Sequence, residues 1–169
     1  MPAWCALRFI LGCMDTLYGP ISIREAEPHE VADLLEKSTN LLASLYPSEA
    51  NHLVSAEELS APGSQLLGAF LGEMAVGMVG LRTLPDEGYA EIKRLFVSEI
   101  HRGAGIATAL MAELEAIAVD MGVGMMRLET GVNQPESLSL YSRLGYTRCD
   151  AFGSYRADDY SVFMEKPLQ

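Results

Sequence analysis

The chain has 169 residues, of which 49% are hydrophobic and 21% charged, a composition typical of a single globular domain. Its formal net charge of −11 argues against a nucleic-acid partner, because phosphate binding needs Lys and Arg clustered over a broad face. The three cysteines lack metal or redox spacing, the three histidines are scattered, and no apolar stretch approaches the roughly 20 residues of a membrane helix. We therefore expect a cytoplasmic protein with no metal site and no membrane partner.

Residues 1–19 precede the first regular pattern, which begins near Ile21. An apolar run in this segment is interrupted by Arg8 and lacks the basic flank and the small-residue cleavage site of a signal peptide. We expect residues 1–19 to be an N-terminal extension packed on the surface. Residues 20–169 are expected to form the one domain.

Periodic patterns predict the secondary structure of this domain. Strands are predicted over Ile21–Arg24, Gln65–Leu71, Met74–Leu81, Tyr89–Val97 and Met125–Thr130, and within Tyr146–Ala151 and Tyr160–Glu165. Helices are predicted over 29–46, around Ala56–Leu59, from Ile106 to Met121 and from the Asn133–Glu136 segment to Leu144. The strand, helix and strand between 89 and 130 should form a parallel unit, so the fold class is α/β, a mixed sheet with helices on its faces.

Local signals mark several ends of these elements. Gly72-Glu73 is suited to a tight hairpin turn between two strands. Gly122 and Gly145 are placed to end the two later helices. Asn133 and Glu136 have the spacing of a capping box at the start of the last helix.

The segment Arg102-Gly103-Ala104-Gly105-Ile106-Ala107 lies between a predicted strand and a predicted helix. Glycines at such a turn let the backbone approach a ligand, and the helix start offers unpaired N–H groups to a phosphate or pyrophosphate. Gly105 is not followed by Lys and Ser or Thr, so the turn is not a P-loop, and the dinucleotide-binding spacing is also absent. From these residues alone, an anion site and a merely tight connection both remain open. Basic residues near this turn in sequence, Lys93, Arg94, His101 and Arg102, are expected to gather around it.

This turn and a second block, Leu140-Tyr141-Ser142-Arg143-Leu144-Gly145-Tyr146, resemble the GCN5-related N-acetyltransferase (GNAT) family. The turn fits the family signature Gln/Arg-x-x-Gly-x-Gly/Ala at every specified position, and the likeness extends over roughly residues 20–168. It implies a mostly antiparallel sheet that splays between its fourth and fifth strands. It also implies direct transfer of an acetyl group from acetyl-CoA, as co-substrate, to an amine.

The resemblance implies roles in cofactor binding for residues of both blocks. The backbone of the turn would hold the pyrophosphate, and the fourth strand would pair with the pantetheine arm and supply an oxyanion donor. Many members have Asn seven residues before the Tyr of the second block, where this chain has Gln134. The implied cofactor-binding residues are Leu95, Phe96, Val97, Arg102, Gly103, Ala104, Gly105, Ile106, Ala107, Asn133, Gln134, Ser137, Tyr141 and Arg143.

The resemblance also implies catalytic residues. Tyr141 matches the usual general acid of the family, although it also fits a core aromatic on an amphipathic helix. An alkyl ammonium must lose a proton before attack, and Glu129 and Glu91 on the central strands are candidate acceptors. Glu91 is alternatively solvated, or paired with Lys93 if the two side chains point the same way.

The acceptor is expected to be a small-molecule or peptide amine. By resemblance, the first helix, the loop after it and the late strands shape its site, and Tyr46, Glu49, His52 and Tyr155 are the candidate contacts. An ordinary polar surface is the alternative for each of them. A non-catalytic acyl-CoA-binding module and a generic phosphate-binding domain are the competing functions, and a homodimer is compatible with the family.

Overall fold

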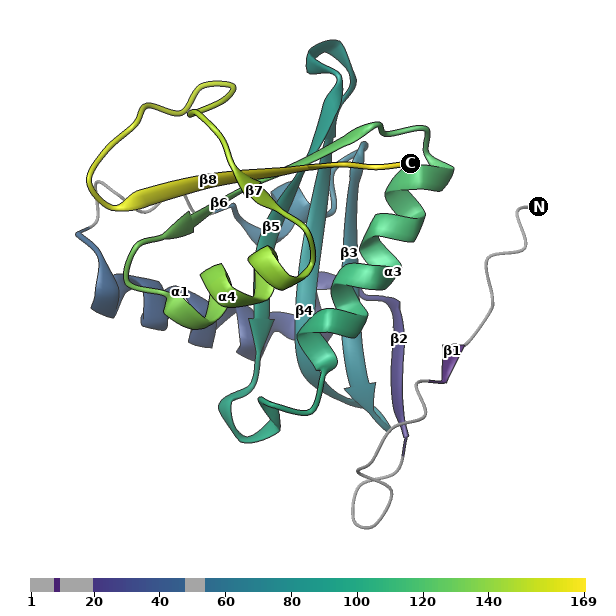
Figure 1. Ribbon diagram of the computed structural model, residues 1–169. Coiled ribbons are helices and arrows are strands. Elements are labelled where there is room, and N and C mark those ends of the chain that lie inside the picture. The colour runs from purple at the N-terminus through teal and green to yellow at the C-terminus, as the bar shows by residue number, and fades with distance from the viewer. Residues whose placement is uncertain (1–7, 10–19, 48–53) are drawn as a thin grey trace.

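The computed structural model describes residues 8–9, 20–47 and 54–169, and Figure 1 shows its chain path. In this part of the chain the strands form one sheet in the order β1-β2-β3-β4-β5-β6-β8-β7. Neighbouring strands are antiparallel except β5 and β6, which are parallel. The strands are β1 (Arg8–Phe9), β2 (Ile21–Glu25), β3 (Ser64–Leu71), β4 (Met74–Leu84), β5 (Tyr89–Val97), β6 (Met125–Gly131), β7 (Thr147–Arg148) and β8 (Ser161–Pro167).

Helices cover both faces of this sheet (Figure 1). They are α1 (Ala32–Leu45), α2 (Ala56–Leu59), α3 (Ile106–Asp120) and α4 (Pro135–Arg143), and short 3-10 turns lie at Pro28–Val31, Pro85–Glu87 and Glu99–His101. None of the helices in the described residues has the length and apolar character needed to cross a membrane.

Two hydrophobic clusters hold the helices on the sheet. On one face, Leu110, Met111 and Leu114 of α3 pack with strand residues such as Val79 and Ile92. On the other face, α1 and α2 bury Leu34, Leu35 and Leu59 against Phe70, Met78 and Phe96. A fully buried Leu contributes about 1.5–3 kcal/mol relative to an exposed one, so each helix is held by several such side chains.

The parallel pair β5 and β6 separates soon after it begins. Register pairing in the described chain runs only from Ala90–Ile92 to Met126–Leu128. Beyond it, β5 stays with β4 and β6 stays with β8, and Figure 1 shows the two strands running apart. The facing edges of β5 from residue 93 and of β6 from residue 129 are therefore left without a strand partner.

A β-bulge in β5 lies at the point of separation. Met78 pairs with Phe96 and Gly80 with Lys93, so Arg94 and Leu95 together oppose the single residue Val79. Arg94 is the non-glycine residue of the described chain with a positive φ, +58°. A bulge of this kind bends its strand and increases its twist, which turns β5 away from β6.

The structure confirms the predicted fold class, a mixed and mostly antiparallel sheet with helices on both faces. The sheet splays between β5 and β6, which are the predicted fourth and fifth strands. The hairpin turn at Gly72 and the helix ends at Gly122 and Gly145 are also confirmed, with φ values of +60°, +77° and +91°. The strand predicted within Tyr146–Ala151 is only the two-residue β7. Most of the predicted extension, residues 1–19, lies outside the described residues.

The predicted capping box at the last helix is wrong. The helix begins at Pro135 with Gln134 in the N-cap position, and no side chain caps its first turn. Proline needs no N–H partner at the first helical position, which sets this start. The side chain of Asn133 instead donates to the backbone oxygen of Leu45, at 3.4 Å.

Candidate functional site

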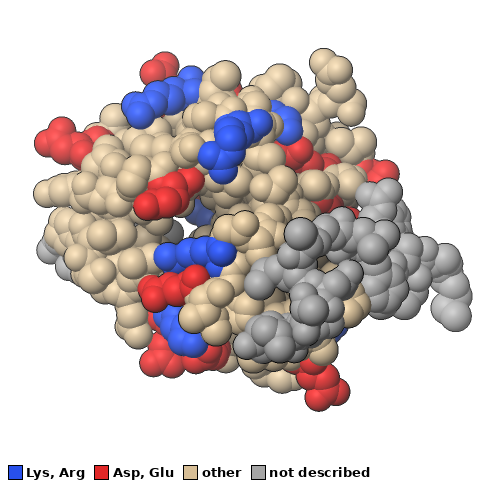
Figure 2. Space-filling model, turned by 60° about the horizontal axis from the view of Figure 1, so that its bottom comes forward, with Lys and Arg blue, Asp and Glu red and all other residues tan. Residues whose placement is uncertain are grey.

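The region between the diverging strands β5 and β6, called the gap below, is bounded by helices on both faces of the sheet. On one face α1 spans it: Arg94 of β5 donates to the backbone oxygen of Leu35, and Asn133, just after β6, donates its N–H to the hydroxyl oxygen of Tyr46. On the other face lie α3 and α4, with Ile106, Leu110 and Tyr141 in the shared core. Figure 2 shows the lower end of the molecule in Figure 1, hollowed near its middle, with basic and acidic side chains around the opening.

The glycine turn lies at the start of α3. Gly103 and Gly105 have φ values of +79° and +80°, which side chains other than glycine rarely adopt, and a Cβ at either would meet nothing within 4 Å. No side chain caps the first turn of α3. Arg102 Nε donates to the backbone oxygen of Val97 at 3.1 Å and so joins the turn to the end of β5. An exposed backbone with uncapped N–H groups at the positive end of a helix fits a phosphate group.

The predicted basic cluster around this turn is wrong for two residues. Lys93 pairs with Glu91, and Arg94 donates to α1, so both side chains bond on the α1 face. Alternation along β5 puts Lys93 on the same face as Glu91, and the bulge puts the next residue, Arg94, on that face as well. Arg102 remains beside the turn, where its guanidinium lies 5.6 Å from the ring centre of Phe96.

Tyr141 lies on α4, on the α3 face of the sheet. Its side chain is buried and its ring meets that of Tyr146 edge to face, with 5.8 Å between centroids. Burial raises the pKa of the Tyr141 phenol well above its ordinary value near 10, so it stays protonated at neutral pH. Tyr146 is different, because its hydroxyl donates to Glu115 Oε1 at 2.9 Å.

Glu91 lies on the opposite face, in a buried polar group with Lys93 and Tyr155. One carboxylate oxygen of Glu91 is 2.7 Å from Lys93 Nζ and accepts from the Tyr155 hydroxyl at 2.6 Å. Lys93 also donates to the Tyr155 hydroxyl oxygen. Of the two structural alternatives for Glu91, a solvated carboxylate or a pair with Lys93, the structure shows the pair. Burial, and then the bond to Glu91, raise the pKa of Tyr155.

Glu129 lies on the part of β6 that has separated from β5. Ser161 Oγ donates to its carboxylate at 2.7 Å, and the side chain is partly exposed. Burial is the largest cause of the raised pKa of Tyr46, and the charge of Glu129 raises it further. For Tyr155, burial and Glu91 come first, and the charge of Glu129 adds to them in raising its pKa. Glu129 therefore belongs to the same group of residues as Glu91, on the α1 face.

Tyr46 closes the far end of this face. It is buried at the end of α1, and a Cβ added at Gly131 would lie 1.9 Å from its hydroxyl oxygen. Its ring meets Tyr160 edge to face, at 6.4 Å between centroids. Tyr46 and Tyr155 are thus brought to one face, whereas the other predicted acceptor contacts, Glu49 and His52, lie outside the described residues.

The remaining predicted cofactor residues fall into two sets. The side chains of Leu95 and Val97 join the α3-side core and that of Phe96 joins the α1-side cluster, so only their backbone can face the gap. Gln134 Oε1 accepts from the N–H of Gly131 at 3.3 Å, Ser137 is partly exposed, and Arg143 Nη1 donates to Ser139. These three lie along the start and outer surface of α4.

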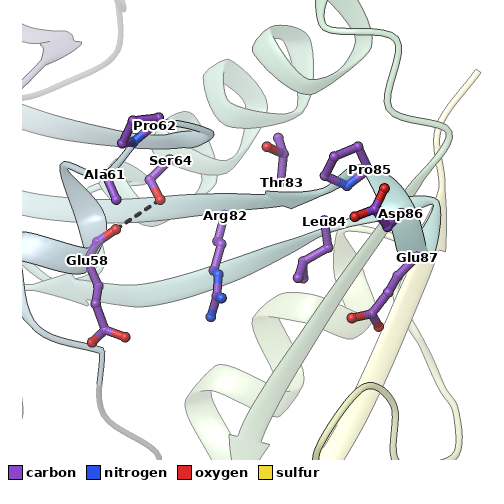
Figure 3. Close-up of a pocket in the computed structure, with 10 residues that line it drawn as sticks. All are labelled: Glu58, Ala61, Pro62, Ser64, Arg82, Thr83, Leu84, Pro85, Asp86 and Glu87. Atoms are coloured by element: carbon purple, nitrogen blue, oxygen red, sulfur yellow. Dashed lines mark hydrogen bonds between the residues drawn. The ribbon is translucent and has the colours of Figure 1, made fainter.

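A separate hollow of about 300 Å³ lies farther along β4, beside the turn after it (Figure 3). Figure 3 shows the Arg82 side chain between Glu58 of α2 and Glu87. Arg82 is the register partner of Glu91 across β4 and β5, so the hollow lies next to the buried Glu91 group. No local sequence pattern predicts this hollow, because its walls come from segments that are separate in the chain.

The chain matches a known protein family over the part that carries this geometry. The sequence model of the Acetyltransferase (GNAT) family matches residues 29–146, which include the gap, the turn and Tyr141. The chain belongs to the GNAT acetyltransferase family. As a GNAT enzyme it is an acyl-CoA-dependent N-acyltransferase.

Individual GNAT relatives agree with this assignment. The chain is 37% identical over 138 residues to the protein named IAA acetyltransferase of Azospirillum brasilense, covering 82% of this chain and 90% of that protein. It is similar to a Klebsiella pneumoniae structure named acyl-CoA N-acyltransferase, at 31% identity and a TM-score of 0.74, covering 88% of this chain and 98% of the other. The PaiA N-acetyltransferase of Thermoplasma acidophilum, solved in complex with coenzyme A, shares the fold at 24% identity, with a TM-score of 0.69, covering 88% of this chain and 99% of the other.

Proposed function

We propose that this GNAT enzyme transfers an acetyl group from acetyl-CoA directly to a primary amine of a small molecule or peptide. The observation that carries the proposal is the gap between β5 and β6, which has the glycine turn at its end, Tyr141 on one face and two glutamates on the other. We assign the transferase domain to residues 20–169.

The backbone around the gap fits acetyl-CoA. Within residues 102–107, the N–H of Arg102 donates to the backbone oxygen of Glu99, and the N–H groups after it would hold the pyrophosphate. The edge of β5 at Leu95 and Val97 would pair with the pantetheine arm as an added strand. Bound in this way, acetyl-CoA supplies an activated acyl group as a thioester. An N–H of the same β5 edge would donate to the thioester oxygen as negative charge develops on it.

The acceptor amine would approach from the α1 face. We assign proton acceptance to Glu129, directly or through one water, because it is partly exposed on the separated part of β6. Glu91 is less suited, since its carboxylate already holds Lys93 and Tyr155. The amine nitrogen then bonds to the carbonyl carbon, and the carbon–sulfur bond breaks. Tyr141 would give its proton to the departing thiolate, because burial keeps the phenol protonated until then.

The function is tested by incubating the purified protein with acetyl-CoA and a panel of primary amines and measuring free CoA thiol. We expect release that depends on the amine and disappears without it. Binding of acetyl-CoA without release for any amine would contradict the transferase and support an acyl-CoA-binding module. Failure to bind acetyl-CoA would leave only a generic phosphate site at the turn.

Replacing Glu129 with Gln should lower kcat/KM for the amine by about 100-fold, because an amide cannot take the ammonium proton. The loss should shrink as the pH is raised toward about 10, where the acceptor ammonium loses its proton without help. The pH–rate profiles of both proteins measure it. Glu73→Gln, in the exposed hairpin turn, is the matched control and should keep the wild-type profile. An unchanged rate at every pH in the Glu129 variant would exclude Glu129 as the base.

A further inference from the structure

Arg94 differs from the other lysine and arginine side chains that are at least partly buried in the described chain. Lys93 pairs with Glu91, Arg127 with Glu165, and Lys166 with Glu115, each with nitrogen and oxygen 2.7 to 3.0 Å apart. Arg94 has no carboxylate within ion-pair distance among the described residues, in a chain whose net charge is −11. Its positive charge is therefore not neutralised by a described side chain.

The hydrogen bonds of Arg94 leave part of the guanidinium unused. Nη2 donates to the backbone oxygen of Leu35 at 2.7 Å and to Thr39 Oγ1 at 2.8 Å. Nε is buried and has no hydrogen-bond partner among the residues that the structure describes. A buried donor without a partner is costly, and the cost is greater for a charged group. Burial lowers the pKa of Arg94, because it disfavours the charged form of the guanidinium.

Arg94 lies close to the place where the acceptor is proposed to bind. Arg94 is next in the chain to Leu95, at the β5 edge where the acyl group is proposed to lie, and its side chain lies on the α1 face. The proposed amine base, Glu129, lies on the same side of the gap. An acceptor whose amine reaches the acyl group from this side would have its remaining atoms near the guanidinium.

We propose that Arg94 binds a carboxylate of the acceptor, so that the preferred acceptor carries an amine and a carboxylate on the same molecule, as amino acids do. This inference rests on the proposed transfer to an amine and narrows the class of amine. A guanidinium with free N–H donors matches a carboxylate in both charge and geometry. The carboxylate would supply the anion that the described residues do not provide.

The test compares matched acceptors that differ only in the carboxylate: β-alanine with β-alaninamide, 4-aminobutyrate with butylamine, and 6-aminohexanoate with hexylamine. For each pair the ratio of kcat/KM values is measured at saturating acetyl-CoA. We expect at least one carboxylate-bearing acceptor to be preferred by about tenfold or more, the size of a charge-assisted hydrogen bond expressed as a rate ratio. Ratios near one for all pairs would overturn the inference.

Variants separate anion binding from the contact with α1. Arg94→Met should bring the preference to about one, and Arg94→Lys, which keeps the charge but not the planar fork, should leave an intermediate preference. Thr39→Val removes one contact of the guanidinium with α1 and should keep the wild-type preference. Acetyl-CoA binding, measured on each variant, verifies that it is folded. A preference kept in Arg94→Met, or lost equally in Thr39→Val, would show that Arg94 only positions α1.

Failure of the proposed function is distinguished by a binding measurement. If no member of any pair is acetylated, the amine transfer itself is wrong. Calorimetric titration of the same pairs into the protein saturated with CoA then tests Arg94 separately. Stronger binding of the carboxylate-bearing members that Arg94→Met abolishes would support the anion site, and equal binding of both members would overturn it.

Discussion

Replacing Tyr141 with Phe is expected to lower kcat by about 100-fold or more, the usual contribution of a general acid. The substitution removes only the hydroxyl, which is the proposed proton donor to the departing thiolate, while the ring keeps its packing against Tyr146. The KM for acetyl-CoA should change little, because the backbone of the turn and of β5 makes the proposed cofactor contacts. Steady-state kinetics with acetyl-CoA varied at saturating amine measure both parameters.

Tyr146→Phe is the matched control for this prediction. It removes the hydroxyl of a second buried tyrosine in the same aromatic pair, but that hydroxyl is bonded to Glu115. We expect Tyr146→Phe to lower stability by about 1–3 kcal/mol, as for a lost hydrogen bond to a charged group, and to keep most of kcat. Equal kcat values for Tyr141→Phe and the wild-type protein would remove Tyr141 from the mechanism.

The second large effect is expected for Glu91→Gln, which should lower the free energy of unfolding by about 3 kcal/mol. The side chains of Glu91 and Lys93 are only 5% and 10% exposed, so the substitution leaves a buried ammonium without its counter-ion. The amide oxygen can still accept from Tyr155, which places the loss at the lower end of the range for broken buried pairs. Urea unfolding followed by circular dichroism measures the change.

Two comparisons identify the cause of this loss. The double variant Glu91→Met and Lys93→Met removes both charges and should recover most of the stability, because buried ion pairs are often replaceable by apolar side chains. Asp33→Asn breaks the exposed pair with Lys37 and should cost less than about 1 kcal/mol. If Glu91→Gln were as stable as the wild-type protein, the pair would not contribute to the stability of the fold.

Features written in short stretches of sequence were predictable. The turn at Gly72 and the helix ends at Gly122 and Gly145 depend on a backbone conformation that glycine adopts easily, so their residue type reveals them. The glycine turn before α3 was found for the same reason. The start of α4 could not be predicted in this way. Asn133 was expected to cap the helix, but its side chain donates to Leu45 of α1, a contact that local sequence does not reveal, and the helix begins at Pro135.

The place of Arg94 on the α1 face could not be predicted from the sequence. The bulge at Arg94 and Leu95 is a register shift between β4 and β5, and no residue type at these positions signals it. Without the bulge, strand alternation would have put Lys93 and Arg94 on opposite faces. The bond from Arg94 to α1 therefore follows from the bulge, whereas Lys93 shares a face with Glu91 by ordinary alternation.

The close contact between Gly131 and Tyr46 links two positions that are 85 residues apart in sequence. The phenol of Tyr46 occupies the space that any side chain at position 131 would need, and its hydroxyl oxygen accepts the N–H of Asn133. The two positions are therefore expected to change together in evolution. A chain that acquires alanine at 131 must also carry a smaller side chain at 46, or one that points elsewhere. Such a paired substitution would also reshape the proposed acceptor end of the site, and would offer a route to a new acceptor without altering the proposed acyl-CoA contacts.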